Sequence, residues 1–127
     1  MTDTEAFFAS KPETLPLYEA IRAAICSAFE EVTVTVQKTQ ISFSNRYNFA
    51  FVSLPARRVK GAPAVYILFT FGLGYQLAHP RIAVSTEPYP NRWTHHVIIQ
   101  DEDEIDDQLM EWVKEAYNFS MYKGRGK

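Results

Sequence analysis

The adjacent histidines at positions 95 and 96 are the residues whose chemistry first needs an explanation. They stand in the segment NRWTHHVIIQ, residues 91–100, whose apolar and β-branched residues predict a β-strand. Two imidazoles could ligate a metal ion or act as an acid–base pair. Neighbours in a strand point to opposite faces, however, so both rings would not reach one metal ion. We therefore expect one imidazole to face a ligand site while the other packs or caps.

Further metal ligands are scarce around this pair. The middle of the chain adds only His79 and Glu87, and no Cys-x-x-Cys or His-Glu-x-x-His motif is present. The acidic run DEDEIDD, residues 101–107, lacks the glycine spacing of an EF-hand and fits helix capping and a solvated face. We expect neither a metal site nor a cofactor.

Charge is distributed unevenly along the chain. The formal net charge is −2, yet residues 32–100 hold seven basic residues and a single acid, Glu87. The other acids gather in residues 1–31 and 101–127. A basic middle between acidic ends favours an anionic partner, such as a small phosphate-bearing molecule or nucleic acid.

Cationic, polar and aromatic side chains in this basic middle form the predicted ligand site. Guanidinium groups bind phosphate or carboxylate, and flat rings stack on other rings. The interleaved aromatic residues are Tyr47, Phe49, Tyr75, Tyr89 and Trp93. The predicted ligand-binding residues are Lys38, Gln40, Ser42, Arg46, Arg81, Arg92, Trp93, His95 and His96. An alternative left open is an ordinary sheet rim, with packed stems, solvated heads and aromatic rings that belong to the core.

Catalysis is a second alternative. His95 or His96 could serve as acid and base with Lys38 steadying a phosphate, as in a small phosphoesterase or lyase. No serine has the glycines of a nucleophile elbow, and GLG at 72–74 lacks the Lys-Ser/Thr of a phosphate loop. Whether the chain is an enzyme stays open, and the residues favour a non-enzymatic binding domain. A third alternative is a protein-interaction domain or homodimer joined through the aromatic surface.

Helical periodicity marks both ends of the chain. Apolar residues at helical spacing predict a first helix over 13–30 and a last helix that follows Asp101, with Glu104 completing a capping box. Cys26 falls on the apolar side of the first helix, so we expect a buried thiol.

The middle of the chain has the pattern of a sheet. Alternating valines over 32–36 predict a strand. The change of parity after it indicates either a bulge or bend near 37–40 or two short strands on a two-sided sheet. Residues 44–48 predict a hairpin turn, 56–63 an exposed basic loop, and 75–93 an irregular stretch with a helical turn at 80–86. The remaining strands are expected at 49–54, 65–71 and 94–99, the second of these being central and covered on both faces. The predicted fold is α+β: a mainly antiparallel sheet of four or five strands with N- and C-terminal helices on one face.

Length and composition indicate a single domain over residues 1–127 with a disordered basic tail at about 121–127. No apolar run approaches the ~20 residues that cross a membrane, and the acidic N-terminus lacks the basic start of a signal peptide. A single cysteine cannot form an internal disulfide, so we expect a cytoplasmic protein without a membrane partner.

Several segments resemble an uncharacterised bacterial family known as a domain of unknown function, number 5655. They are VQKTQISFSNRYNFAFVSLP, YILFTFGL, HPRI and PYPNRWTHHVII, and both FFASKPETLPLYEAIR and EIDDQLMEWVKEAY fit the same family. The resemblance implies this fold and a stand-alone cytoplasmic protein. Fusion of family members to nuclease-like domains favours nucleic acid or nucleotides as partners. The order of elements is more distantly similar to iron-chaperone-like α+β domains, and this likeness transfers no iron site.

Overall fold

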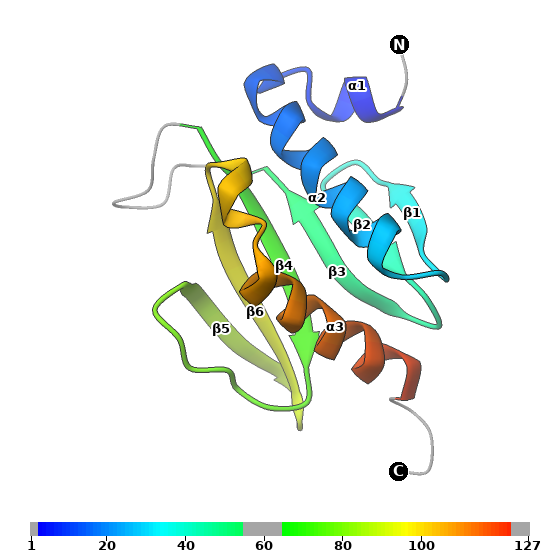
Figure 1. The fold of residues 1–127 in the computed structure, drawn as a ribbon, viewed down its shortest axis with the longest axis vertical. Helices are drawn as coiled ribbons and strands as arrows, with labels where there is room; N and C mark the ends of the chain where they lie inside the picture. Colours follow the sequence, from blue (N-terminus) through cyan, green and yellow to red (C-terminus); the bar gives the residue numbers. More distant parts are fainter. Residues whose placement is uncertain (1–2, 55–64, 123–127) are drawn as a thin grey trace.

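The protein folds into two layers, a sheet and a set of helices (Figure 1). The computed structural model describes residues 3–54 and 65–122. The helices are α1 (Asp3–Phe7), η1 (Pro12–Thr14), α2 (Leu15–Ala28), η2 (Glu102–Glu104) and α3 (Asp107–Tyr122). The strands are β1 (Thr33–Val36), β2 (Ile41–Ser44), β3 (Asn48–Ser53), β4 (Ile67–Leu73), β5 (Ile82–Tyr89) and β6 (Arg92–Ile99). The α+β class with one antiparallel sheet is confirmed, whereas the expected four or five strands are wrong because the sheet has six.

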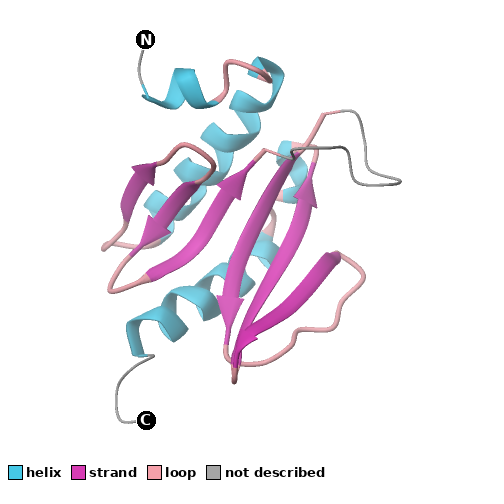
Figure 2. Ribbon diagram, turned by 180° about the vertical axis from the view of Figure 1, so that it is seen from behind, coloured by secondary structure: helices cyan, strands magenta, loops and turns pink. Residues whose placement is uncertain are grey.

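The strands lie in the order β1-β2-β3-β4-β6-β5, and every neighbouring pair is antiparallel. The helices all lie on the same side of this sheet, behind it in Figure 2. Strand β4 is central, as expected. Its residues are buried or half-buried on both faces, although the described helices all lie on one face. We call the side away from the helices the open face.

Strand β5 is the element that the sequence pattern hid. It occupies residues expected to be irregular, with a helical turn at 80–86. Most of its side chains are exposed because it is an edge strand, so it lacks the apolar alternation of a half-buried strand. Its pairing with β6, through Val84 opposite His96 and Ser85 opposite His95, defines it as a strand.

The change of parity at residues 37–40 is a hairpin turn between β1 and β2, in which the Gln37 N–H donates to the Gln40 carbonyl at 2.9 Å. The register instead shifts between β2 and β3. Phe43 pairs with Ala50 and Ser44 with Asn48, which leaves Phe49 without a partner on β2. This bulge turns the ring of Phe49 toward Phe29 and Tyr117 on the helical side.

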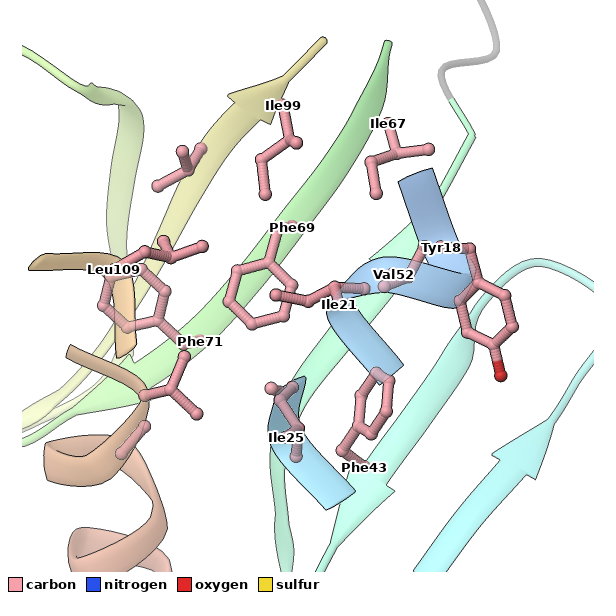
Figure 3. Packing of buried hydrophobic residues seen from close by; sticks show 14 of the residues in the cluster. Tyr18, Ile21, Ile25, Phe43, Val52, Ile67, Phe69, Phe71, Ile99 and Leu109 are labelled. Atoms are coloured by element: carbon pink, nitrogen blue, oxygen red, sulfur yellow. The ribbon is translucent and has the colours of Figure 1, made fainter. Parts of the chain in front are cut away.

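The core lies between the sheet and helices α2 and α3 (Figure 3). Ile21 projects from α2 toward Phe69, Ile25 of the same helix lies beside Phe43, and Leu109 of α3 lies beside Phe71. All six side chains are fully buried. Cys26, next to Ile25, is exposed on the outer side of α2, so the expected buried thiol is wrong. Successive residues of an α-helix are rotated by ~100° about its axis, which is enough to place position 26 outside the apolar stripe that contains Ile25.

The helix ends differ in detail from the sequence expectations. The predicted helix 13–30 is divided into η1 and α2, with prolines in the first turn of each. Asp101 and Glu104 form the expected capping box, but it caps the short η2. Helix α3 begins later, where the Asp106 carboxylate accepts the N–H of Leu109 at 3.0 Å.

Two expectations fall largely on residues that are not described. The basic loop 56–63 and positions 123–127 of the expected tail lie outside the described residues, while residues 121 and 122 belong to α3. Within the described ranges, no helix combines the length and the apolar character needed to cross a bilayer.

Candidate functional site

The two histidines of β6 lie on opposite faces of the sheet. His95 shares the helical side with Val97 and Ile99, and His96 shares the open face with Thr94 and Ile98. Strand geometry therefore gives the two imidazoles different surroundings, as the sequence predicts. The structure assigns the packed position to His95 and the open position to His96.

His95 is a core residue. It is fully buried, and its ring stacks on Phe71 with a centroid distance of 5.2 Å and an interplanar angle of 16°. Its Nε2 accepts the N–H of Leu77 at 2.8 Å, which fastens the segment after β4 to the sheet. Its buried Nδ1 has no hydrogen-bond partner among the described residues. Burial lowers the pKa of His95; the backbone of Phe71 opposes this shift and nearby His96 adds to it. The ring is therefore neutral at pH 7.

His96 belongs to a row of side chains that crosses all six strands on the open face. The register aligns these residues as Thr35, Ser42, Phe51, Thr70, His96 and Val84. We call them the central row. Nδ1 of His96 lies 2.9 Å from Oγ1 of Thr70 and forms a hydrogen bond with it, and burial lowers the pKa of His96. The side chains of Phe51 and His96 are half-buried, and Val84 is 51% exposed. The row thus offers two flat rings with a hydroxyl between them.

A hollow of about 340 Å³ lies at one end of the sheet, where β3, β4 and the hairpin between β5 and β6 meet α3. Gly72 forms part of its lining, and Arg92 and Tyr89 stand on its rim from the hairpin. Aromatic side chains make up much of the remaining lining of the hollow. The lining residues are Tyr47, Asn48, Phe51, Phe71, Gly72, Leu73, Pro88, Tyr89, Arg92, Trp93, Thr94 and Phe119.

The predicted ligand-binding residues are brought together only in part. Arg92 and Trp93 line the hollow, and exposed Arg46 lies 5.6 Å from the ring centre of Tyr47, another lining residue. Ser42 and His96 belong to the central row. Lys38 and Gln40 lie in the turn at the opposite end of β2, where Gln37 accepts hydrogen bonds from Gln40 at 3.2 Å and from Ser42 at 3.1 Å.

Arg81 has a set of partners within the protein. Its guanidinium donates to the Asp106 carboxylate at 3.0 Å, to the Glu104 carbonyl at 2.7 Å and to Gln108 at 3.2 Å. It also lies 5.8 Å from the ring centre of Trp112. Together these contacts tie the start of β5 to the beginning of α3, on the helical side of the sheet.

Some of the aromatic residues that the sequence analysis selected pack within the protein, and others line the hollow. Phe49 is a core residue. The Tyr75 hydroxyl donates to Glu115 at 2.6 Å, and this bond raises the pKa of Tyr75 to about 12. Tyr89 is 70% exposed beside the hollow. The sequence reasoning missed Phe51, Thr70 and Gly72. For Thr70 and Gly72, the available signal was a polar or small residue inside an apolar run.

Acids are separated from the open face. Every described acidic residue except Glu87 lies on a helix or beside one. Glu87 accepts the N–H of Asn91 at 3.0 Å within the β5–β6 hairpin. Within residues 3–54 and 65–122, no three His, Cys, Asp or Glu side chains come together in a way that could hold a metal ion.

Comparison with known proteins identifies the family. No curated protein and no solved structure matches the chain. A family model described as a domain of unknown function (DUF5655) matches residues 4–120, which include all six strands, the central row and the hollow. The chain therefore belongs to the DUF5655 family.

Proposed function

We propose that the protein is a binding domain that holds single-stranded nucleic acid, through its nucleotide units, on the open face of the sheet. The observation that carries this proposal is the alignment of Phe51, Thr70 and His96 on three adjacent strands. The two rings are two strand spacings apart, or ~10 Å. Sheets that bind RNA stack bases on such exposed rings, and hydroxyl groups between the rings bind base edges or sugars.

The charge distribution supports the same ligand. Three described cations lie at the ends of the sheet: Lys38 at one end, and Arg46 and Arg92 at the other, where the Arg92 guanidinium is 5.8 Å from the ring centre of Phe119 on α3. The described acids other than Glu87 lie with the helices, so a polyanion is repelled from the helical side. Phosphate contacts supply much of the affinity for nucleic acid, whereas rings supply contacts to the bases.

The same geometry favours binding over the alternative phosphoesterase or lyase. His95 and His96 face opposite sides of the sheet and cannot both reach one phosphate. Ser42 of β2 is three strand spacings from His96, or ~14 Å, and Lys38 lies beyond the start of β2. We place this binding in the bacterial cytoplasm, because the family resemblance indicates bacteria and the lone cysteine fits a reducing compartment.

Self-association through the edge strand β5 is a second candidate function. Val84 and Tyr89 are exposed apolar residues on this strand, at 51% and 70%. Edge strands pair readily with a second chain, although Pro88 and the irregular register of β5 oppose this. Sedimentation velocity at increasing protein concentration distinguishes a monomer from a dimer. A monomer at every concentration contradicts this candidate.

The test of nucleic-acid binding is fluorescence anisotropy with short single-stranded DNA and RNA at low salt. Phe51→Leu keeps the apolar character of the position but removes the ring face. Since base stacking is worth ~1–3 kcal/mol, we expect this variant to bind about 5- to 150-fold more weakly. Tyr75→Leu is the matched control, because it removes an exposed ring that is bonded to α3. Absence of binding to every oligonucleotide by the unaltered protein would overturn the proposal.

A further inference from the structure

We infer that the hollow beside Gly72 holds one nucleobase of the bound strand, with Arg92 binding the adjoining phosphate. This inference rests on the proposed function and names a subsite within it. It predicts that a free nucleoside monophosphate binds to the hollow, whereas the central row binds the neighbouring nucleotides of a longer strand.

Gly72 carries the first part of the argument. Glycine inside a strand weakens it, and is found where a bulge occurs, where space is short or where a ligand comes close to the backbone. The β4–β6 register runs without a shift through Gly72 and Thr94, so there is no bulge. The backbone of Gly72 does not adopt a positive φ, and a Cβ added there would meet nothing closer than the Trp93 carbonyl at 3.8 Å. Close approach of a ligand is the explanation that remains.

Gly74 provides a contrast within the same segment. A Cβ added at Gly74 would lie 3.0 Å from Cε1 of Phe119, so packing against α3 explains that glycine. The same test gives no packing reason for Gly72. Its missing side chain instead leaves open the floor of the hollow.

The lining of the hollow fits a base joined to a phosphate. Phe51, Tyr89 and Trp93 supply rings, Thr94 supplies a hydroxyl, and Arg92 supplies a guanidinium at the rim. The lining contains no acidic residue, so nothing within it repels a phosphate. A volume of about 340 Å³ lies at the lower end of the range for small-molecule sites, which suits a single nucleotide.

The hollow also lies next to the central row. Gly72 follows Thr70 by two residues on β4, and Thr94 precedes His96 by two residues on β6. Residues two apart in a strand share a face and are ~7 Å apart. A single-stranded nucleic acid with one base in the hollow can therefore place its next base against Phe51 or His96.

The test uses Gly72→Val, which fills the hollow with two methyl groups. Valine is favoured in strands, and a Cβ atom at this position meets nothing closer than 3.8 Å, so we expect the melting temperature to be unchanged or higher. Thr33→Val is the matched control, because it places valine on the open face at the far edge of the sheet, outside the central row. Binding of adenosine and uridine monophosphates is followed by fluorescence of Trp93, while Trp112 stays buried against Phe71. Trp93→Phe identifies the source of the signal.

We expect Gly72→Val to weaken monophosphate binding by about tenfold or more and Thr33→Val to leave it unchanged. Arg92→Ala should weaken binding of the monophosphate, while Arg22→Ala on α2 should not. Equal monophosphate affinity of Gly72→Val and the unaltered protein overturns the inference. If Phe51→Leu still weakens oligonucleotide binding in that case, the proposed function stands without this subsite. If the unaltered protein binds neither probe, both fail.

Discussion

His95 and His96 are adjacent in β6, yet Nε2 of His95 accepts the Leu77 N–H at 2.8 Å on the helical side while Nδ1 of His96 lies 2.9 Å from Thr70 Oγ1 on the open face. The first bond is buried and holds the segment after β4 against the sheet. The second keeps a ring in place on a surface that a ligand can reach. Substitutions at the two positions should therefore have different consequences.

His95→Ala should destabilise the fold far more than His96→Ala. Loss of the stacked ring leaves a cavity beside Phe71, and the Leu77 N–H loses its acceptor. We expect a decrease of ~2–4 kcal/mol in the free energy of unfolding for His95→Ala and ~1 kcal/mol for His96→Ala. Urea denaturation measures both, and similar losses for the two variants would contradict this assignment.

The stability of the protein should fall as the pH decreases below about 6.5. Burial lowers the pKa of both His95 and His96 in the folded state, from an ordinary value of 6.5. Below that value the unfolded chain binds protons that the folded protein does not, so acid favours unfolding. Each imidazole contributes at most ~1.4 kcal/mol per pH unit, and the loss ends below its folded pKa. At higher pH both imidazoles are neutral in the folded and the unfolded protein, so their titration should not change the stability.

Thermal melting across pH 5 to 8 measures this effect. A His96→Gln variant should show a shallower dependence on pH than the unaltered protein, since one imidazole is removed. Asp106 is a separate source of pH-dependent stability. The hydrogen bond from the Leu109 N–H lowers the pKa of its carboxyl below 3.8, so its contribution is lost only in more acidic solution. A melting temperature that rises on acidification through pH 6 would contradict the prediction.

Arg81 and Arg92 should differ in what their removal changes. Arg81→Ala breaks the bonds to Asp106 and Glu104, and we expect it to lower stability by ~1–2 kcal/mol without changing oligonucleotide affinity. Arg92→Ala loses the contact between its guanidinium and the ring of Phe119, so it should lower stability, but by less than Arg81→Ala. It should also weaken binding and reduce the salt dependence of binding by about one phosphate contact. Parallel melting and anisotropy titrations test the pair. The reverse pattern would show that Arg81 is the phosphate ligand.

Cys26 should react with a thiol reagent in the native protein. Its side chain is exposed on the outer side of α2, so no unfolding is needed for attack. We expect one thiol to be modified at a rate within about an order of magnitude of that in denaturant. A colorimetric assay under both conditions measures the ratio. A native rate that follows global unfolding would place the thiol in the core.

Local patterns predict the elements whose burial is local. Valine alternation marks β1, and apolar spacing marks α2 and α3. The sequence pattern does not predict strand β5, because most side chains of this edge strand are exposed and apolar residues do not alternate with polar ones. The sequence pattern does not predict the bulge at Phe49 either. The ring of Phe49 packs against Phe29 and Tyr117, which are distant in the chain.

The candidate site shows the same limit. Strand periodicity predicts that the two histidines separate, but only the packing of α3 on β3 and β4 decides which one is buried. The partnership of Arg81 with Asp106 spans 25 residues and cannot be inferred from either segment alone. Phe51, Thr70 and His96 come from three strands, and only the sheet register aligns them.

The position of α3 in the chain has a consequence for synthesis. Its residues Leu109, Trp112, Val113 and Ala116 close one half of the core, and they are translated after every strand that they cover. A nascent chain that has already formed β3 and β4 therefore presents Phe69 and Phe71 to solvent until α3 leaves the ribosome. During that interval an incomplete chain is a substrate for chaperones and proteases, and a translational pause just before Asp107 would prolong it.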